Sequence, residues 1–164
     1  MVYLSLGTNI GDKEANLNAA IKEIDRQIGN VKAQSAFIVT KPWGFESEND
    51  FLNACVEVET ILKPMELLDR CPAIERSLGR MQKSKTVVNP DGTTTHFYHD
   101  RVIDIDILIY DDLVIQTPRL TIPHPLMHKR RFVLEPLAQI AYNLNIPGTT
   151  ISAGEMLKAL DAEV

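Results

Sequence analysis

Hydrophobic and polar positions change their period several times along the 164-residue chain, and each change predicts an element. A short strand is expected over Val2 to Leu6. Apolar residues then recur at steps of three and four between residues 13 and 28, which predicts an amphipathic helix. A second strand is expected over Val31 to Thr40, and strict alternation from Phe51 to Thr60 predicts a third, half-buried strand. The first part of the chain therefore has the order strand, helix, strand, strand.

A second helix is predicted to begin at Pro64, because proline is favoured in the first turn of a helix and apolar residues follow at helical spacing as far as Gly79. Pro72 lies inside this helix. Proline lacks a backbone N–H and clashes with the preceding turn, so we expect Pro72 to kink the helix or to split it near Arg70.

A polar stretch, Met81 to Asp100, separates this helix from the next strand and carries an Asn-Pro-Asp-Gly turn, which predicts a protruding hairpin. The strand that ends at Tyr110 follows, then a short strand at Leu113 to Ile115 and a helix-rich end. The order predicts an α+β fold of the ferredoxin-like βαββαβ type. This fold has an antiparallel sheet with two helices on one face, here with a C-terminal strand and helix extension.

Length and composition favour one globular domain over residues 1–164, with 45% hydrophobic and 24% charged residues. The net charge of −5 argues against nucleic-acid binding, because such domains usually have a basic face. Neither a signal segment nor a membrane-length apolar run occurs, so we expect a cytoplasmic monomer without membrane contact. Cys55 and Cys71 lack disulfide or zinc spacing and are expected to be buried thiols.

Asp104 and Asp106 are the most informative polar positions, because they interrupt the isoleucine-rich strand before Tyr110. Alternation places both carboxylates on one strand face, roughly 6.5 to 7 Å apart between Cα atoms and opposite the isoleucines at 103, 105, 107 and 109. Two ionised carboxylates this close repel each other unless a cation lies between them. Oxygen ligands suit Mg²⁺, which completes its shell with water and substrate phosphates. The alternative is an edge strand whose polar face meets water.

Several arginines lie near the carboxylate pair or follow it. They are Arg76, Arg80, Arg101, Arg119, Arg130 and Arg131. Guanidinium groups bind phosphate oxygens in pairs, which suggests a polyphosphate ligand, whereas each arginine alone is compatible with a surface ion pair. A Gly-rich phosphate-binding loop is absent, so arginines and a metal would hold the phosphates. His124, fixed between two prolines, either contacts a phosphate or serves as a turn residue.

Flat apolar residues form another group: Trp43, Phe51 and Phe132, with Asn53 on the same strand face as Phe51. A planar heterocycle favours stacking between rings beside an amide that both donates and accepts hydrogen bonds. The alternative is an aromatic core cluster. His96 and His99 have the spacing of zinc ligands on a helix, but a hairpin without a third ligand does not favour zinc.

Six segments, in register, resemble the 6-hydroxymethyl-7,8-dihydropterin pyrophosphokinase family. They are Gly7-Thr-Asn-Ile-Gly-Asp12, Thr40-Lys-Pro-Trp-Gly44, Phe51-Leu-Asn-Ala54, Ile74-Glu-Arg-Ser-Leu-Gly-Arg80, Arg101-Val-Ile-Asp-Ile-Asp-Ile-Leu108, and Arg119-Leu-Thr-Ile-Pro-His-Pro125 through Arg130-Arg-Phe-Val-Leu-Glu-Pro-Leu137. The resemblance covers residues 1 to about 145. It implies transfer of pyrophosphate from ATP to the hydroxymethyl group of the dihydropterin, giving AMP and the pterin diphosphate in folate biosynthesis.

The resemblance also implies roles for single residues. Asp104 and Asp106 would hold two Mg²⁺ ions against the triphosphate, while Arg80 and Arg101 neutralise the moving charge. The other positions around the nucleotide are Glu75, Arg119, Thr121, His124 and Arg130. The positions in the pterin pocket are Thr40, Pro42, Trp43, Phe51, Asn53 and Phe132, with Phe51 and Phe132 on either side of the ring.

The chain departs from the commonest family pattern in a longer insert between Arg80 and Arg101, and in Tyr98 where a tryptophan is often found. Family members close loops over their substrates, and residues 41–50 and 81–99 are the candidates. Two other functions stay open. Palm-type polymerases and cyclases use carboxylates and two metals on a similar core but release pyrophosphate, and a ferredoxin-like sensor would bind its ligand without a metal.

Overall fold

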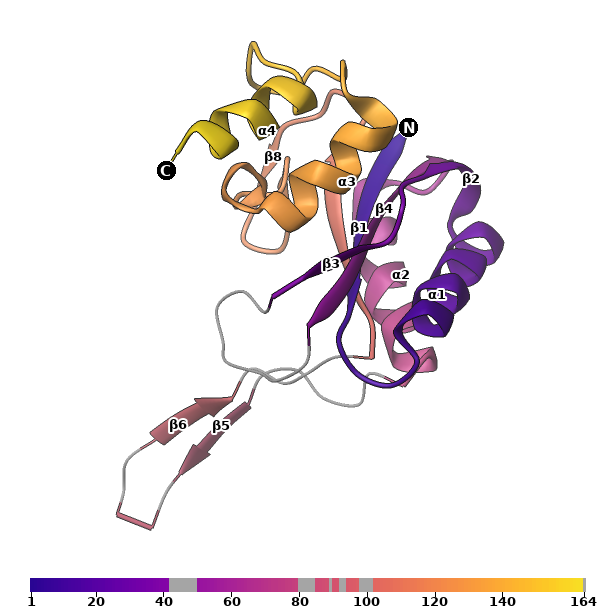
Figure 1. Cartoon of the computed structure of the whole chain (residues 1–164). Coiled ribbons are helices and arrows are strands. Elements are labelled where there is room, and N and C mark those ends of the chain that lie inside the picture. The colour runs from indigo at the N-terminus through magenta and orange to yellow at the C-terminus, as the bar shows by residue number, and fades with distance from the viewer. Residues whose placement is uncertain (42–49, 80–84, 89, 92–93, 98–101, 164) are drawn as a thin grey trace.

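The computed structural model describes residues 1–41, 50–79, 85–88, 90–91, 94–97 and 102–163 (Figure 1). The described elements are β1 (Val2–Thr8), α1 (Lys13–Gln27), β2 (Gly29–Gln34), β3 (Ile38–Thr40), β4 (Phe51–Thr60), α2 (Pro64–Ser77), β5 (Lys85–Val88), β6 (Thr94–Phe97), β7 (Asp104–Tyr110), β8 (Ile115–Gln116), β9 (Thr121–Ile122), the 3-10 helix η1 (Met127–Lys129), α3 (Arg131–Ala141) and α4 (Ala153–Ala162).

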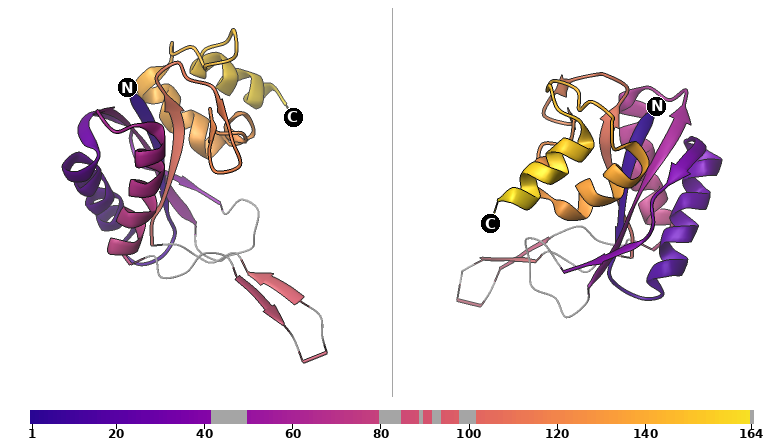
Figure 2. Two further views of the ribbon diagram at one scale, coloured as in Figure 1. Left: turned by 180° about the vertical axis from the view of Figure 1, so that it is seen from behind. Right: turned by 45° about the horizontal axis from the view of Figure 1, so that its top comes forward.

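The central sheet is antiparallel and has the strand order β2-β4-β1-β7, with β3 also paired to β4. This order confirms the predicted ferredoxin-like fold. Helices α1 and α2 cover one face and enclose an apolar cluster with the sheet, which we call the α1–α2 cluster (Figures 1 and 2). Its fully buried members include Leu4, Leu6, Leu17, Ile24, Val56, Val58, Ile74 and Ile103.

The opposite face of the sheet is also covered, because α3 packs on β4 and β1 and α4 packs on α3 (Figure 2). The apolar residues enclosed there form what we call the α3 cluster. They include Tyr3, Cys55, Leu108, Ile109, Val133, Leu134, Leu137 and Met156. The predicted half-buried strand is therefore buried on both faces where Cys55 contacts this cluster. Cys55 and Cys71 are both buried free thiols, as predicted.

The alternation of β7 is reversed near its end. Tyr3 pairs with Ile109 but Leu4 pairs with Ile107, so Leu108 is an extra residue in a β-bulge. Before the bulge the isoleucines face the α1–α2 cluster, as predicted, whereas the prediction for Ile109 was wrong because this residue lies in the α3 cluster. Asp104 and Asp106 precede the bulge and share the face opposite those isoleucines.

The single strand predicted over residues 31–40 is instead divided into β2 and β3. The division lies at residues 35–37, and Ser35 bonds β4 through both its backbone and its side chain. Its N–H donates to the Cys55 carbonyl at 2.9 Å, and its Oγ accepts the Cys55 N–H at 2.9 Å. The next N–H, of Ala36, donates to Oε1 of Gln139 on α3 at 2.9 Å. Side-chain acceptors thus replace part of the strand pairing at this point.

Both predicted helices begin and end at the expected signals. Asp12 caps α1 by accepting the Ala15 N–H at 3.1 Å, and Pro64 occupies the first turn of α2. Gly79 follows α2 with φ +107°, a conformation that glycine adopts without a Cβ clash. The predicted split near Arg70 is wrong, since α2 continues through Pro72, where the buried neighbours in the α1–α2 cluster hold the helix against the sheet. The alternative of a kink at Pro72 stays a prediction.

The predicted hairpin is confirmed by β5 and β6, which pair from Lys85 with Phe97 to Val88 with Thr94. Both figures place this ribbon outside the body formed by the sheet and the helices. The short strand begins at Ile115 rather than Leu113, because the Leu113 N–H closes a turn on the Tyr110 carbonyl at 3.1 Å. In the described part of the chain, every helix is too short or too polar to cross a bilayer.

Candidate active site

Polar and small residues of three neighbouring strands meet on the α3 side of the sheet, beyond the α3 cluster. Gly7 of β1 pairs with Asp104 of β7 on one side and with Asn53 of β4 on the other. Ser5 pairs in the same way with Asp106. Because directly opposed residues in antiparallel strands share a face, these side chains form one patch. We call it the polar end of the sheet.

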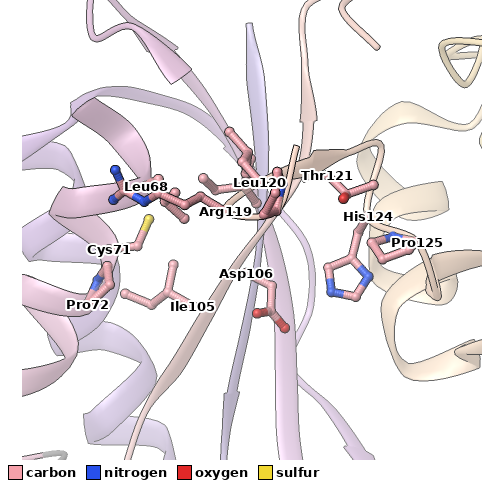
Figure 3. Close-up of a pocket in the computed structure, with 12 residues that line it drawn as sticks. Leu68, Cys71, Pro72, Ile105, Asp106, Arg119, Leu120, Thr121, His124 and Pro125 are labelled. Carbon is pink, nitrogen blue, oxygen red and sulfur yellow. The ribbon is translucent and has the colours of Figure 1, made fainter. Parts of the chain in front are cut away.

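The two aspartates are half-buried, and β7 is the outermost strand of the described sheet on this side. The topology alone therefore agrees with the alternative of an edge strand. The surroundings favour a site, however, because Asp106 lines a cavity of about 270 Å³ between α2, β7 and the segment around β9 (Figure 3). Within the described residues, no three or more His, Cys, Asp or Glu side chains gather as a metal site.

The cavity has an apolar side and a polar side. Helix α2 contributes Leu68, Cys71 and Pro72, which face Leu120 and the β7 isoleucines. Burial, and secondarily the nearby carboxylates, raises the pKa of Cys71 to about 12, so its thiol is a neutral part of the wall. Asp106, Thr121 and His124 line the other side (Figure 3). Such a cavity suits a ligand with one apolar and one charged part.

His124 is held in one orientation at the polar side of the cavity. Its backbone N–H donates to the Leu108 carbonyl at 3.0 Å, and its Nδ1 accepts the Leu126 N–H at 3.2 Å. Burial, together with the Arg130 cation, lowers the His124 pKa to about 4, although Asp104 opposes the shift. The ring is therefore neutral near pH 7, and because Nδ1 accepts, Nε2 carries the proton. Figure 3 shows the ring projecting toward Asp106.

Arg119 and Arg130 have different partners. The Arg119 side chain extends from the β9 segment toward α2, where Nη2 bonds Asp69 Oδ1 at 2.9 Å (Figure 3). Both partners are exposed, at 62% and 68%. The Arg130 guanidinium lies 5.6 Å from the centre of the Phe132 ring, in the first turn of α3. Arg119, Thr121 and His124 thus line one cavity, while Arg130 acts on it electrostatically through His124.

Three of the residues predicted to bind pterin also meet at the polar end. Asn53 Nδ2 donates to Thr40 Oγ1 at 2.6 Å and to the Ile38 carbonyl at 3.4 Å. Since the Ile38 oxygen can only accept, this pair fixes the amide orientation, and Oδ1 faces Gly7 with the Phe51 ring beside it. The amide was predicted to donate and accept; here its nitrogen donates to β3 and its carbonyl oxygen faces the Gly7 position.

Glu75 contacts the backbone of β7, and its predicted place around the nucleotide stays a prediction. It is buried and its Oε2 accepts the Ile105 N–H at 2.9 Å, so it joins α2 to the outer edge of β7 rather than lining the cavity. It holds the strand that carries both aspartates. Pro42, Trp43, Arg80 and Arg101 lie outside the described residues, as do Tyr98, His99, the side chain of His96 and most of the 41–50 and 81–99 segments.

Sequence reasoning missed Gly7 as a member of the polar end, and Leu68, Cys71 and Leu120 as cavity walls. The first strand was predicted to end at Leu6, whereas β1 continues through Gly7 to Thr8. With the strand extended, the glycine inside it would have been a signal, because such a glycine often marks a close approach. The cavity walls carried no such signal, since apolar residues at helical spacing predict a core position equally well. The predicted stacking of Phe51 against Phe132 across a ligand stays a prediction.

A model of the 7,8-dihydro-6-hydroxymethylpterin-pyrophosphokinase (HPPK) family matches residues 3–142. A Porphyromonas gingivalis 2-amino-4-hydroxy-6-hydroxymethyldihydropteridine pyrophosphokinase is 46% identical over 142 residues, covering 86% of this chain and 90% of that protein. A protein of the same name from Methylorubrum extorquens is 41% identical over 160 residues, covering 97% and 92%. The crystal structure of wild-type Plasmodium falciparum HPPK-DHPS with pteroate matches 96% of this chain with a TM-score of 0.74. At 14% identity that likeness shows the fold alone, and this chain spans 44% of the Plasmodium chain.

Proposed function

Because this chain belongs to the 7,8-dihydro-6-hydroxymethylpterin-pyrophosphokinase family, we propose that the polar end of its sheet holds the two substrates of that reaction on either side of the aspartates. The enzyme transfers pyrophosphate from ATP to the hydroxymethyl group of 6-hydroxymethyl-7,8-dihydropterin, in folate biosynthesis. The observation that carries the proposal is the row formed by Asp104, Gly7 and Asn53 across three paired strands. In this row the Asp104 carboxylate and the Asn53 amide are on one face of the sheet, separated by Gly7, which supports two neighbouring binding positions.

ATP occupies the cavity between α2 and β7. Its apolar parts lie against Leu68, Cys71 and Leu120, and its phosphates lie toward Asp106 and His124. His124 then donates its Nε2 proton to a phosphate oxygen while remaining neutral, which adds no charge to be desolvated. Arg119 and Thr121 complete the nucleotide side, and Arg130 adds positive charge behind His124.

Asp104 and Asp106 have the donor chemistry that Mg²⁺ prefers, as two half-buried carboxylates on one strand face. The described residues offer no third clustered ligand, so water and phosphate oxygens would fill the remaining positions. Mg²⁺ held there by Asp104 and Asp106 would neutralise phosphate charge, and the family resemblance implies two ions. Arg80 and Arg101, as predicted from the sequence, add positive charge on the transferred group.

The pterin lies on the other side of the aspartates, with Asn53 Oδ1 accepting one of its N–H groups. Thr40 fixes the Asn53 amide through the 2.6 Å hydrogen bond, which favours that one orientation. Phe51 and Phe132 enclose the ring, and Pro42 and Trp43 complete the predicted pocket. A planar ring gains contact area from such stacking, while the carbonyl selects a donor at its edge.

The reaction needs positioning more than covalent help from the protein. The hydroxymethyl oxygen attacks the β-phosphorus of ATP, the bond from that phosphorus to the α,β-bridging oxygen breaks, and AMP leaves with that oxygen. The proton of the hydroxymethyl group is released. Fixed charges that match the developing charge lower the barrier, and holding the two substrates together removes the entropic cost of their encounter.

The proposal includes the biological unit. Residues 1–164 act as one catalytic domain, as a cytoplasmic monomer, and sedimentation of the purified enzyme at several concentrations tests the oligomeric state. The packing of α1 and α2 on one face of the sheet and of α3 on the other supports the single domain, because both clusters share the same strands.

Product identification tests the proposed function. Purified enzyme is mixed with ATP, Mg²⁺ and hydroxymethyldihydropterin, and we expect AMP and pterin diphosphate in equal amounts by chromatography. Omission of the pterin, or of Mg²⁺, should abolish AMP formation. Release of free pyrophosphate with AMP retained in a product would support the polymerase or cyclase alternative instead. Pterin binding without any turnover would support the sensor alternative.

A further inference from the structure

Gly7 occupies a position in β1 whose backbone does not require glycine. It is paired on both sides, with Asn53 and with Asp104, and its φ lies outside the left-handed range. Any residue could adopt this backbone, and glycine weakens a strand because it restricts the unfolded chain less than other residues do. A glycine kept inside a paired strand therefore indicates that space, rather than conformation, is needed there.

That space is bounded by two residues of the proposed pterin pocket. A Cβ built on Gly7 would lie 3.1 Å from Asn53 Oδ1 and 3.5 Å from Cδ1 of the Phe51 ring. The second distance is an ordinary contact, but the first requires the Asn53 carbonyl to retreat by a few tenths of an ångström. A methyl group at this position would therefore act first on the acceptor that faces the polar end.

Asn53 has little freedom to retreat, because its amide nitrogen is bound on the opposite side. Nδ2 donates to Thr40 Oγ1 at 2.6 Å and to the Ile38 carbonyl at 3.4 Å, and both acceptors belong to β3. A shift of the carbonyl away from β1 would compress or break the bond to Thr40. The amide is thus held between β3, which binds its nitrogen, and β1, which leaves room for its oxygen.

We infer that Gly7 is a specificity-determining residue for the pterin, which acts by positioning the Asn53 carbonyl and the Phe51 ring without contacting the nucleotide. The inference rests on the proposed function, since it assigns the pterin to this pocket. Its consequence is a separation of the two substrates: a methyl group on Gly7 weakens pterin binding and leaves ATP binding unchanged. Alanine is better suited than glycine to a strand interior, but the strained Asn53–Thr40 bond opposes this gain, so the net change in stability is expected to be small.

The test is equilibrium binding to the full chain, which does not depend on turnover. Hydroxymethyldihydropterin and a non-hydrolysable ATP analogue are titrated separately into the native enzyme and into Gly7→Ala, with Mg²⁺ present. We expect the pterin Kd of Gly7→Ala to rise about tenfold, the size of a lost hydrogen bond, while the nucleotide Kd stays within about twofold. The melting temperature should change little, because the gain from alanine in the strand and the strain at Asn53 oppose each other.

Tyr3→Phe is the matched control, on the same strand and the same face but within the α3 cluster. It removes the hydroxyl that donates to Glu57, and should lower the melting temperature without changing the pterin Kd. A double-mutant cycle between Gly7→Ala and Asn53→Ala gives the mechanism. If Gly7 acts through Asn53, then Gly7→Ala should cause little further loss of pterin affinity in a protein that already carries Asn53→Ala. Additive losses of pterin affinity would refute an effect of Gly7 through Asn53.

The outcomes also separate this inference from the proposed function. Native enzyme that forms no AMP contradicts the proposed function, yet its binding data still test Gly7. Native enzyme that forms AMP, with a Gly7→Ala variant that binds pterin normally, overturns the inference alone. An equal loss of both ligands, or a variant that does not fold, overturns it too, because the strand must tolerate the methyl group.

Discussion

The same three strands form two very different surfaces on the α3 side of the sheet. At one end, Tyr3, Cys55 and Leu108 are buried against α3. At the other end, Gly7, Asn53 and Asp104 form the polar end, which contributes the proposed substrate pocket. The change from buried to polar residues takes four residues along β1, from Tyr3 to Gly7, and two residues along β4, from Cys55 to Asn53. Stability and chemistry are thus separated along the strands rather than between domains.

The bulge at Leu108 lies on the boundary between these two ends. It turns both Leu108 and Ile109 toward the α3 cluster, so β7 contributes two consecutive residues to that cluster, separated from Asp106 by one residue. The apolar end also contains a partly buried hydrogen bond from the Tyr3 hydroxyl to Glu57. Burial, followed by this bond, raises the Tyr3 pKa well above its usual value. This end is therefore expected to support folding, and the polar end to support catalysis.

The largest expected effect comes from the aspartates. Asp106→Asn keeps the shape of the side chain but removes the charge that favours a metal, and we expect kcat to fall about a thousandfold, equivalent to about 4 kcal/mol in the barrier. Asp104→Asn should behave similarly. The melting temperature should stay the same or rise, because the like charges at the polar end are reduced. Steady-state AMP formation and thermal denaturation measure the two quantities.

Asp112→Asn is the control for these variants, since Asp112 is exposed and lies beyond the end of β7. It should leave kcat unchanged. A near-normal kcat for Asp106→Asn and Asp104→Asn would remove the proposed metal role. A large loss of stability in either variant would instead show that the polar end also supports folding, which would contradict the comparison between the two ends.

A smaller effect is expected from the apolar end. Leu137 is fully buried in α3, and Leu137→Ala should lower the free energy of unfolding by about 2 to 5 kcal/mol through a cavity in the α3 cluster. Both KM values, measured where the variant is folded, should not change. Urea denaturation gives the first quantity and initial rates give the second. Leu113→Ala is the control at an exposed position, and it should lower the free energy of unfolding by less than about 1 kcal/mol. A changed pterin KM in Leu137→Ala would contradict the separation of stability and catalysis between the two ends.

The fold could be predicted from the sequence because its main signals are local. The periodic helices, the alternation in β4 and the prolines and glycines at helix ends all correspond to the structure. The division at Ser35 and the reversal at Ile109 could not be predicted, since each depends on pairing between distant segments. Ser35 bonds Cys55, and Ala36 bonds Gln139, across 103 positions in sequence.

Positions in the candidate site could be predicted where polar side chains have the spacing of a strand, and could not be predicted elsewhere. Asp104 and Asp106 share a face because strand geometry dictates it, and Asn53 meets Thr40 through strand pairing. The position of Glu75 at the edge of β7 and the pairing of Arg119 with Asp69 depend on how α2 packs, which no local pattern specifies. The sequence resemblance assigned Glu75 and Arg119 to the nucleotide, and the structure adds a contact within the protein for each of these two residues.

The smallest effect concerns His124, which connects the two ends through its backbone bond to Leu108 and its ring near Asp106. Its pKa in the fold, about 4, lies below the ordinary value of 6.5, so the folded state binds fewer protons than the unfolded state between these values. The stability from this group is complete above about pH 6.5 and is lost as the pH falls toward 4. Because the ring is partly exposed, we expect a loss of about 1 to 2 kcal/mol rather than the full shift.

Urea denaturation of the ligand-free enzyme at pH 7 and pH 4.5 measures this loss, and comparison with His124→Asn isolates it from the carboxylates that titrate in the same range. The variant should lose less stability than the native enzyme over this interval, by about 1 to 2 kcal/mol. His128→Asn is the matched control, because His128 is exposed one turn away and should leave the native pH dependence unchanged. Equal pH dependence in all three proteins would mean that the His124 ring is solvated. In that case His124 would belong to the solvated polar end, and the boundary of the buried end would lie between His124 and α3. The Nε2 proton of His124 would then no longer be held in place for a phosphate.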